Sequence, residues 1–160
     1  DRVQHYFGRE ILVENPSTYL SFTINEMTEY DFINEIARRT GCFVLLDVNN
    51  VYVQSVNHGF DPYDYIDRID LRPVKEIHLA GHTERTFDDG IILVDTHNRP
   101  VGDDVWALYE HTIKKTGSVP TLIEWDGDIP ELSTLVMQSD MAQRIIDRYS
   151  TQDDTAHEAA

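Results

Sequence analysis

Four short, mostly apolar runs in this sequence each end on a residue that can bind a metal ion or move a proton. They are Ile11–Val13 before Glu14, Phe43–Leu46 before Asp47, Val74–Ile77 before His78, and Thr121–Ile123 before Glu124. Such runs are typical of strands buried on both faces, from which parallel sheets are built. Ligands bind at the carboxyl edge of such sheets, so we expect these four side chains to meet there.

The segment Asp95-Thr96-His97 adds two more candidate ligands. Side chains two positions apart on an extended segment point to the same side, so Asp95 and His97 could grip one ion. Carboxylate and imidazole together suit iron, manganese or zinc. A carboxylate such as Glu14 or Glu124 has lone pairs for two ions, which then lie about 3.5–4 Å apart. The set predicts a transition-metal site.

Each of these residues also has a structural explanation when it is taken alone. A glutamate after a strand is more often a helix cap or a surface acid, and His78 could be a hydrogen-bonded core residue. Asp95, Asn49 and Asn50 could be turn formers, and His58 could be an ordinary loop residue. The joint placement of ligand-type residues at several strand ends favours the metal site over these separate explanations.

The composition excludes several classes of protein. The 160 residues, 41% of them hydrophobic, are enough for one domain with a core. The 29 acidic and 13 basic residues give a net charge of −16, which argues against nucleic acid and anionic membranes as partners and fits a site for several cations. Cys42 is the only cysteine, so an internal disulfide is excluded. Without a signal peptide or a membrane span, we expect a cytoplasmic protein.

Helices are expected between the strands. Their expected ranges are Asn25–Arg39, Asp61–Ile69, Asp103 or Asp104 to Gly117, and Asp128–Ile146, with a helix end near Val3–Phe7. We expect a long polar loop over Asn49–Pro62 and a polar excursion over Thr83–Gly90, followed by a short apolar piece at Ile91–Val94. Residues 1–150 would form the domain, and residues 151–160 a disordered acidic tail.

The repeated order of strand and helix implies a parallel sheet with right-handed crossovers. Four such units form either a small doubly wound sheet or half of a (β/α)8 barrel, which takes roughly 250 residues when complete. We expect the chain to open inside a fold, because residues 1–9 carry neither a start methionine nor a targeting pattern. This favours an α/β fold that is the C-terminal half of a TIM barrel.

Several motifs resemble those of one bacterial family. They are Glu14-Asn15-Pro16-Ser17 with Tyr19, Leu46-Asp47-Val48-Asn49-Asn50-Val51-Tyr52, Asn57-His58-Gly59, Ile77-His78-Leu79-Ala80-Gly81-His82, Asp95-Thr96-His97 and Ile123-Glu124-Trp125-Asp126. The family is that of the multinuclear non-heme iron-dependent oxidases, which includes the methanobactin-biosynthesis oxidase. The resemblance runs from about Val3 to about Ile146. The order of ligands is also similar to that of the three-zinc apurinic endonucleases and, more loosely, the sugar isomerases, which implies a xylose-isomerase-like TIM barrel.

The resemblance implies a set of metal ligands, with Glu14 bridging two ions. The implied ligands are Glu14, Asp47, Asn50, His78, Asp95, His97 and Glu124. Of these, Asp47, His78 and Glu124 would complete the coordination of one ion and carry the catalysis. His58, His82, Asn49 and Trp125 would contact the substrate or support the ligands. Family members carry an N-terminal half with two more strand-end histidines that this sequence does not show. We therefore expect a fragment that is inactive alone.

The resemblance also implies an activity. Two or three iron ions of mixed valence, with zinc or manganese as alternatives, would use O2 to modify cysteine residues of a ribosomally made precursor peptide. A partner protein would present the peptide. One rival is a metal-dependent hydrolase or isomerase of the same barrel type. Another is an inactive fragment that only binds a partner chain.

Overall fold

The computed structural model describes residues 2–157, with side chains described for residues 2–150. Its centre is a sheet of four strands, β1 (Leu12–Glu14), β2 (Phe43–Asp47), β3 (Val74–Ala80) and β6 (Thr121–Glu124). The strands lie in the order β1-β2-β3-β6, and every neighbouring pair is parallel. The prediction of an α/β fold with a parallel sheet is confirmed. The sequential strand order is consistent with part of a (β/α)8 barrel.

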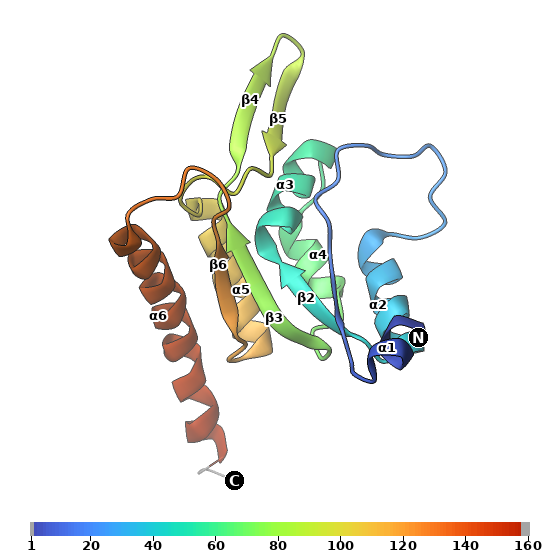
Figure 1. Cartoon of the computed structure of the whole chain (residues 1–160), viewed down its shortest axis with the longest axis vertical. Helices are drawn as coiled ribbons and strands as arrows, with labels where there is room; N and C mark the ends of the chain where they lie inside the picture. The colour runs from blue at the N-terminus through green and yellow to red at the C-terminus, as the bar shows by residue number, and fades with distance from the viewer. Residues whose placement is uncertain (1, 158–160) are drawn as a thin grey trace.

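Most of the connections between strands are helical. Within the described residues the helices are α1 (Arg2–Phe7), α2 (Glu29–Thr40), α3 (Val48–His58), α4 (Pro62–Arg68), α5 (Asp103–Thr116) and α6 (Leu132–His157). A separate antiparallel hairpin of β4 (Thr83–Phe87) and β5 (Gly90–Val94) projects beyond the carboxyl edge of the sheet (Figure 1). None of the helices in this part of the chain is long and apolar enough to cross a membrane.

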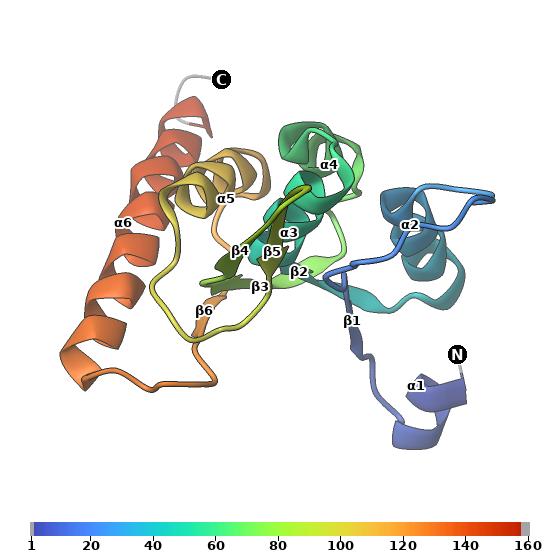
Figure 2. The same cartoon turned by 90° about the horizontal axis from the view of Figure 1, so that it is seen from above.

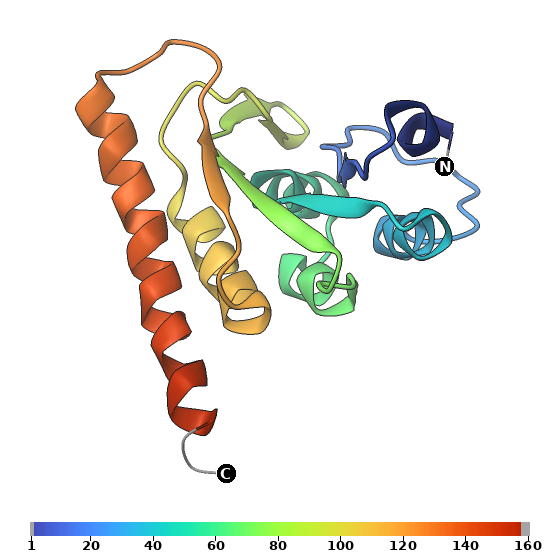
Figure 3. The same cartoon turned by 60° about the horizontal axis from the view of Figure 1, so that its bottom comes forward.

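The two faces of the sheet have different surroundings. Val44, Leu46 and Ile77 are buried on one face, the side on which α4, α5 and α6 lie (Figure 2). On the opposite face, Leu12 and Leu122 are 39% and 45% exposed. No helix of the described residues lies across the middle of that face (Figure 3). The sheet therefore has one packed face and one open face.

Local sequence signals explain where the helices begin and end. Thr28 caps α2 by accepting a hydrogen bond from the Asp31 N–H, and Gly41 ends that helix with a φ of 68°. Asp61 caps α4 in the same way, and Pro62 occupies the first turn, where its missing N–H costs nothing. These caps fix the positions at which the chain returns to the sheet.

The predicted polar loop over Asn49–Pro62 is wrong. The segment begins as α3, because the Asp47 side chain accepts a hydrogen bond from the Asn50 N–H and Gly59 ends the helix with a φ of 72°. Four polar residues of α3, Asn49, Asn50, Gln54 and Ser55, are buried, so the helix lacks the apolar periodicity that normally indicates one. The second expected excursion, Thr83–Gly90 with Ile91–Val94, forms the β4–β5 hairpin.

The last helix is longer than predicted. It begins at Leu132 and continues past Ser150 to His157. The boundary at residue 151, where the sequence indicated a disordered tail, therefore does not coincide with a helix end. Residues 158–160 of that tail lie outside the described residues. At the other end of the chain, α1 and a left-handed Gly8 confirm the predicted helix end near Val3–Phe7.

Candidate metal centre

The register of the sheet places the four strand-end residues on its open face. Asp47 pairs with His78 across β2 and β3, and Glu14 pairs with Leu45, which lies on the same face as Asp47. His78 pairs with Leu122, two residues before Glu124. Because side chains alternate along a strand, all four acids and imidazoles leave the sheet on one side. The convergence predicted from the sequence is present.

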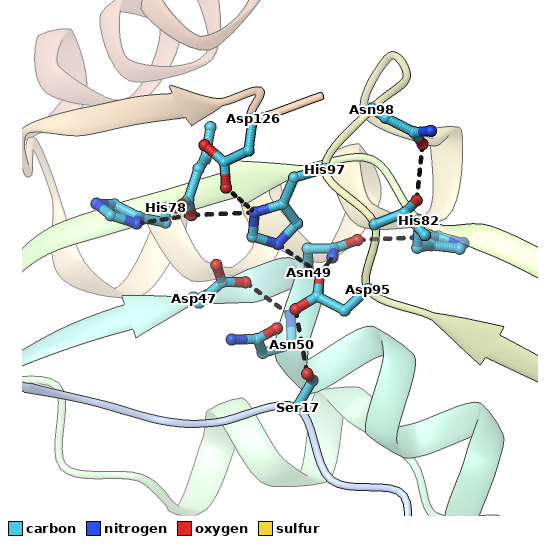
Figure 4. A network of polar contacts seen from close by, with 12 residues as sticks. Ser17, Asp47, Asn49, Asn50, His78, His82, Asp95, His97, Asn98 and Asp126 are labelled. Carbon is cyan, nitrogen blue, oxygen red and sulfur yellow. Dashed lines mark hydrogen bonds and ion pairs between the residues drawn. The ribbon is translucent and has the colours of Figure 1, made fainter. Parts of the chain in front are cut away.

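Two groups of ligand atoms lie close enough to share an ion. Glu14, Asp47 and His78 each offer one atom within 4.8 Å of the others, and so do Asp47, His97 and Glu124. Asp47 belongs to both groups, which makes it the geometric centre of the cluster. Figure 4 shows Asp47 between His78 and His97. Glu124 links the two histidines, since its Oε2 is 3.2 Å from Nδ1 of His78 and 3.5 Å from Nδ1 of His97.

Asp47 is held rigidly in a fully buried position. One carboxylate oxygen accepts a hydrogen bond of 2.7 Å from the Asn50 N–H. Its backbone is clamped by the side chain of Asn15, which accepts from the Asp47 N–H at 2.8 Å and donates to the Asp47 carbonyl at 2.9 Å. Burial raises the pKa of Asp47 to about 7, and the neighbouring Asp95 and Glu14 add to the increase. The site therefore holds a buried carboxyl group whose ionised form is only partly compensated, by His97.

Three buried polar atoms around Asp47 have no hydrogen-bond partner. They are Oδ2 of Asp47, Oδ1 of Asn50 and Nε2 of His97. Leaving such atoms unpaired is costly, so a buried group of this kind requires an explanation. Oδ1 of Asn50 can only accept a hydrogen bond, and Oδ2 of Asp47 can only accept one while the carboxyl group is ionised. A bound cation would satisfy all three, because carboxylate, amide oxygen and neutral imidazole are all metal ligands.

Asp95 and His97 contact each other, but the extended conformation predicted for their segment is wrong. His97 has a left-handed φ of 47°. Two backbone hydrogen bonds stabilise this turn: the His97 N–H donates to the Gly81 carbonyl at 3.0 Å, and the His97 carbonyl accepts from the Asp126 N–H at 2.7 Å. Nε2 of His97 lies 2.6 Å from Oδ1 of Asp95, yet the two atoms lack hydrogen-bond geometry.

The protonation states of the cluster follow from its charges. The contact with Asp95 raises the pKa of His97 to about 9, although burial opposes the increase. Burial also raises the pKa of Glu14. In the metal-free chain near neutral pH, His97 is therefore a cation that compensates part of the carboxylate charge. A metal ion would have to displace its proton.

Residues behind the ligands hold Asp95 from three directions. Asn49 donates to Oδ1 of Asp95 at 2.7 Å, and the Ser17 hydroxyl donates to Oδ2 at 3.1 Å. The Asp95 N–H donates to the Tyr19 hydroxyl oxygen at 2.9 Å. His82 contacts Asn49 through Nδ1 at 2.9 Å, on the side away from Asp95. Asn49 and His82 thus lie behind the cluster.

His58 and Trp125 lie apart from this network. His58 is at the far end of α3, where its Nε2 contacts the carbonyl and hydroxyl of Thr18 at 2.9 and 3.0 Å. It ties the long segment after β1 to α3. Trp125 follows Glu124, and its indole N–H is buried without a hydrogen-bond partner. Neither residue belongs to the two ligand groups found among the described residues.

The sequence analysis gave no role to Asn15, Ser17 or Tyr19 beyond their place in a motif. Asn15 is completely buried and holds the backbone of Asp47, and the other two position Asp95. The available signal was their position directly after Glu14, in a segment that must pass over the edge of the sheet to reach α2.

Comparison with known proteins identifies the family. Residues 1–147 match the family described as RiPP precursor modification enzyme MbnB/TglH/ChrH. The chain belongs to this family. The description is that of enzymes that modify precursor peptides. It also agrees with the resemblance that the strand-end motifs indicated.

Relatives in several bacteria carry only a provisional name. The chain is 46% identical over 151 residues to a UPF0276 protein of Rhizobium meliloti, covering 94% of this chain and 49% of that protein. It is 46% identical over 149 residues to a UPF0276 protein of Vibrio parahaemolyticus, covering 93% and 52%. It is 49% identical over 141 residues to a UPF0276 protein of Bordetella bronchiseptica, and the match covers 88% of this chain and 49% of that protein. The chain spans about half the length of these relatives.

Proposed function

We propose that this chain carries part of a multinuclear metal centre, with Asp47 common to its two ligand groups. Glu14 and His78 would complete the ligands of one ion, and His97 and Glu124 those of the other. The observation that supports this assignment is the set of buried, unpartnered atoms of Asp47, Asn50 and His97. Asn50 and Asp95 would add an amide oxygen and a carboxylate to these ligands.

The metal is proposed to be iron, in two or three ions of mixed valence, with zinc and manganese as the competing choices. The mixture of carboxylate and imidazole suits all three metals, and family membership favours a redox-active one. Iron bound there would supply the oxidation of cysteine residues in a precursor peptide by O2. Few protein ligands per ion leave open positions for oxygen and for a thiolate.

The residues of the chain have defined tasks in this proposal. The carboxylate of Asp47 is fixed in direction by the Asn50 N–H, while Asn15 fixes its backbone. Glu124 lies between His78 and His97 and would keep both imidazoles directed at the cluster. His97 would yield its proton when a metal binds, since only the neutral ring is a ligand.

The open face of the sheet is proposed to be the inner face of a xylose-isomerase-like (β/α)8 barrel. Its exposed apolar residues include Leu12 and Leu122, and the relatives have about as much additional sequence as the chain itself. The β4–β5 hairpin and the segment between β1 and α2, which flank the metal centre, are the proposed contact surfaces for the peptide and for a partner protein that presents it.

Metal analysis combined with oxygen uptake tests this function. A full-length protein that contains this chain is reconstituted anaerobically with Fe²⁺, and its iron content and O2 consumption are measured with a cysteine-containing precursor peptide. Bound iron with peptide-dependent O2 consumption is expected. Bound zinc without oxygen uptake, combined with hydrolysis or isomerisation, would instead support a hydrolase or isomerase of the same barrel type. A folded chain that binds no metal would support a role limited to partner binding.

A further inference from the structure

Asn49 is a buried connection between two side chains from distant parts of the sequence. Its side chain is completely buried at the start of α3. It donates to Oδ1 of Asp95, which follows β5, and contacts Nδ1 of His82, which follows β3 (Figure 4). Asn49 therefore joins three structural elements at the rim of the cluster without being one of the proposed ligands.

The chemistry of the three groups fixes the direction of every hydrogen bond. The carboxylate of Asp95 only accepts, so the amide NH2 of Asn49 must face it. The amide oxygen of Asn49 then faces His82, and an amide oxygen also only accepts. Nδ1 of His82 must therefore carry the proton. The neutral ring of His82 is left with its lone pair on Nε2.

The surroundings of His82 agree with a ring that is held in place. The ring lies 5.2 Å from the ring of Tyr52, measured between centroids, and the Tyr52 hydroxyl donates to Asp104 at 2.8 Å. The other oxygen of Asp95 is held by Ser17. Asn49 thus connects the fixed imidazole of His82 to the carboxylate of Asp95, which faces His97.

We propose that Asn49 is a positioning residue that directs the Asp95 carboxylate toward His97 and holds the proton of His82 on Nδ1. The part concerning Asp95 rests on the proposed metal centre, whereas the part concerning His82 does not. An aspartate at position 49 would place two carboxylates against each other. An alanine would leave the Asp95 carboxylate with only the Ser17 hydrogen bond and the contact with His97, and would leave Nδ1 of His82 without the Asn49 acceptor.

The tautomer of His82 is measured in the metal-free chain by long-range ¹H–¹⁵N correlation of uniformly ¹⁵N-labelled protein. The wild type is expected to show the Nδ1–H form. Asn49→Ala is expected to shift His82 toward the Nε2–H form that is common in unconstrained histidines. Asn57→Ala is the matched control, because Asn57 also lies on α3 and bonds the backbone of Leu93 on β5, away from Asp95.

Titration with Co²⁺, followed by its visible absorption, gives the second readout. Asn49→Ala and Asn49→Asp are expected to weaken Co²⁺ binding by about 10- to 100-fold, as is usual when a residue supporting a ligand is removed. Asn57→Ala is expected to leave both the affinity and the His82 tautomer unchanged.

An Nε2–H tautomer of His82 in the wild type would overturn the proposal, and this measurement needs no variant. A folded Asn49→Ala chain with unchanged tautomer and Co²⁺ affinity would also overturn it. If the wild type binds no Co²⁺ but His82 is Nδ1–H and responds to Asn49→Ala, the proposed metal centre fails and the hydrogen-bonding role of Asn49 stands. If Asn49→Ala does not fold, the volume-matched Asn49→Asp variant decides the effect on Co²⁺.

Discussion

Asp47 and His78 lie side by side in register across two parallel strands, where β2 ends at Asp47 and β3 continues two residues further, to Ala80. A carboxylate and an imidazole that are far apart in sequence thereby leave the sheet on the same face. Glu124, one strand further along, reaches the same His78 at 3.2 Å. Strand pairing alone therefore assembles half of the proposed ligand set, and the following predictions concern what this arrangement does.

Replacing Asp47 by Asn is expected to stabilise the metal-free chain at alkaline pH. Burial raises the pKa of Asp47 from 3.8 to about 7. The folded chain therefore keeps a proton that the unfolded chain has lost, and stability falls as the pH rises through this window. The Asn variant avoids that loss, so its free energy of unfolding at pH 8 should exceed that of the wild type by on the order of a few kcal/mol.

Urea unfolding at pH 5 and pH 8, with a chelator present, measures this effect. The stabilisation should be larger at pH 8 than at pH 5. An advantage of the Asn variant that is the same at both pH values would show that Asp47 is not the titrating group. The same variant should lose metal binding, because an amide replaces the shared carboxylate.

Metal binding at pH 7 is expected to release a proton from His97. The pKa of this imidazole is about 9, chiefly because of Asp95, so the ring is protonated before a metal arrives and neutral afterwards. Calorimetric titration with Zn²⁺ in two buffers of different ionisation enthalpy gives the number of protons released. His111→Gln, on α5 and away from the cluster, should behave like the wild type. A binding heat independent of the buffer would refute the role of His97.

Gly81→Ala is expected to displace the segment that carries His97. A Cβ at position 81 would lie 2.2 Å from the Arg99 carbonyl oxygen and 2.6 Å from that of Pro100. Both atoms belong to the backbone, so the segment must shift, at a cost of roughly 1–3 kcal/mol in stability. Metal affinity should fall with it. Thermal unfolding and Co²⁺ titration measure the two effects.

Gly102→Ala provides the control for that variant. A Cβ at Gly102 would meet only Cε1 of His82, at the ordinary distance of 3.7 Å. Its φ of −75° is allowed for alanine. The Gly102→Ala chain should therefore keep the stability and the metal affinity of the wild type. Equal losses in both variants would show that the close contact at Gly81 has no special importance.

The sequence predicts the four strands of the central sheet well because each contains a short apolar run that leads to a ligand-type residue, although β3 continues past His78 to Ala80. Phe43–Asp47 and Thr121–Glu124 have the predicted limits. The helix α3 escaped prediction because its buried residues include Asn49, Asn50 and Gln54. A helix that turns amides toward a polar site has the composition of a loop, and only the tertiary contacts show the difference.

The candidate site was predictable in its members and less so in its geometry. The alternation of side chains along an extended segment predicts Asp95 beside His97. The two side chains do meet, but a left-handed turn at His97 brings them together. That turn depends on hydrogen bonds to Gly81 and Asp126, which no local pattern reveals. Asn15 was missed for the same reason, since its function is to bind the backbone of a residue on another strand.

The isolated chain is expected to associate in solution. The open sheet face exposes apolar side chains, and β1 and β6 each have one edge without a strand partner among the described residues. Such edges promote pairing between chains. Light scattering should show a mass above that of one 18.5 kDa chain. A monodisperse monomer would contradict the proposal that this face is the inside of a barrel.

The most direct test of the proposed metal centre is the iron content of the complete protein, measured by elemental analysis after anaerobic reconstitution. The wild type should bind at least two iron ions if each of the two ligand groups around Asp47 holds one. Asp47→Ala and Glu124→Ala should lose iron while keeping the circular-dichroism spectrum of the wild type. Full iron occupancy in either variant would contradict the assignment.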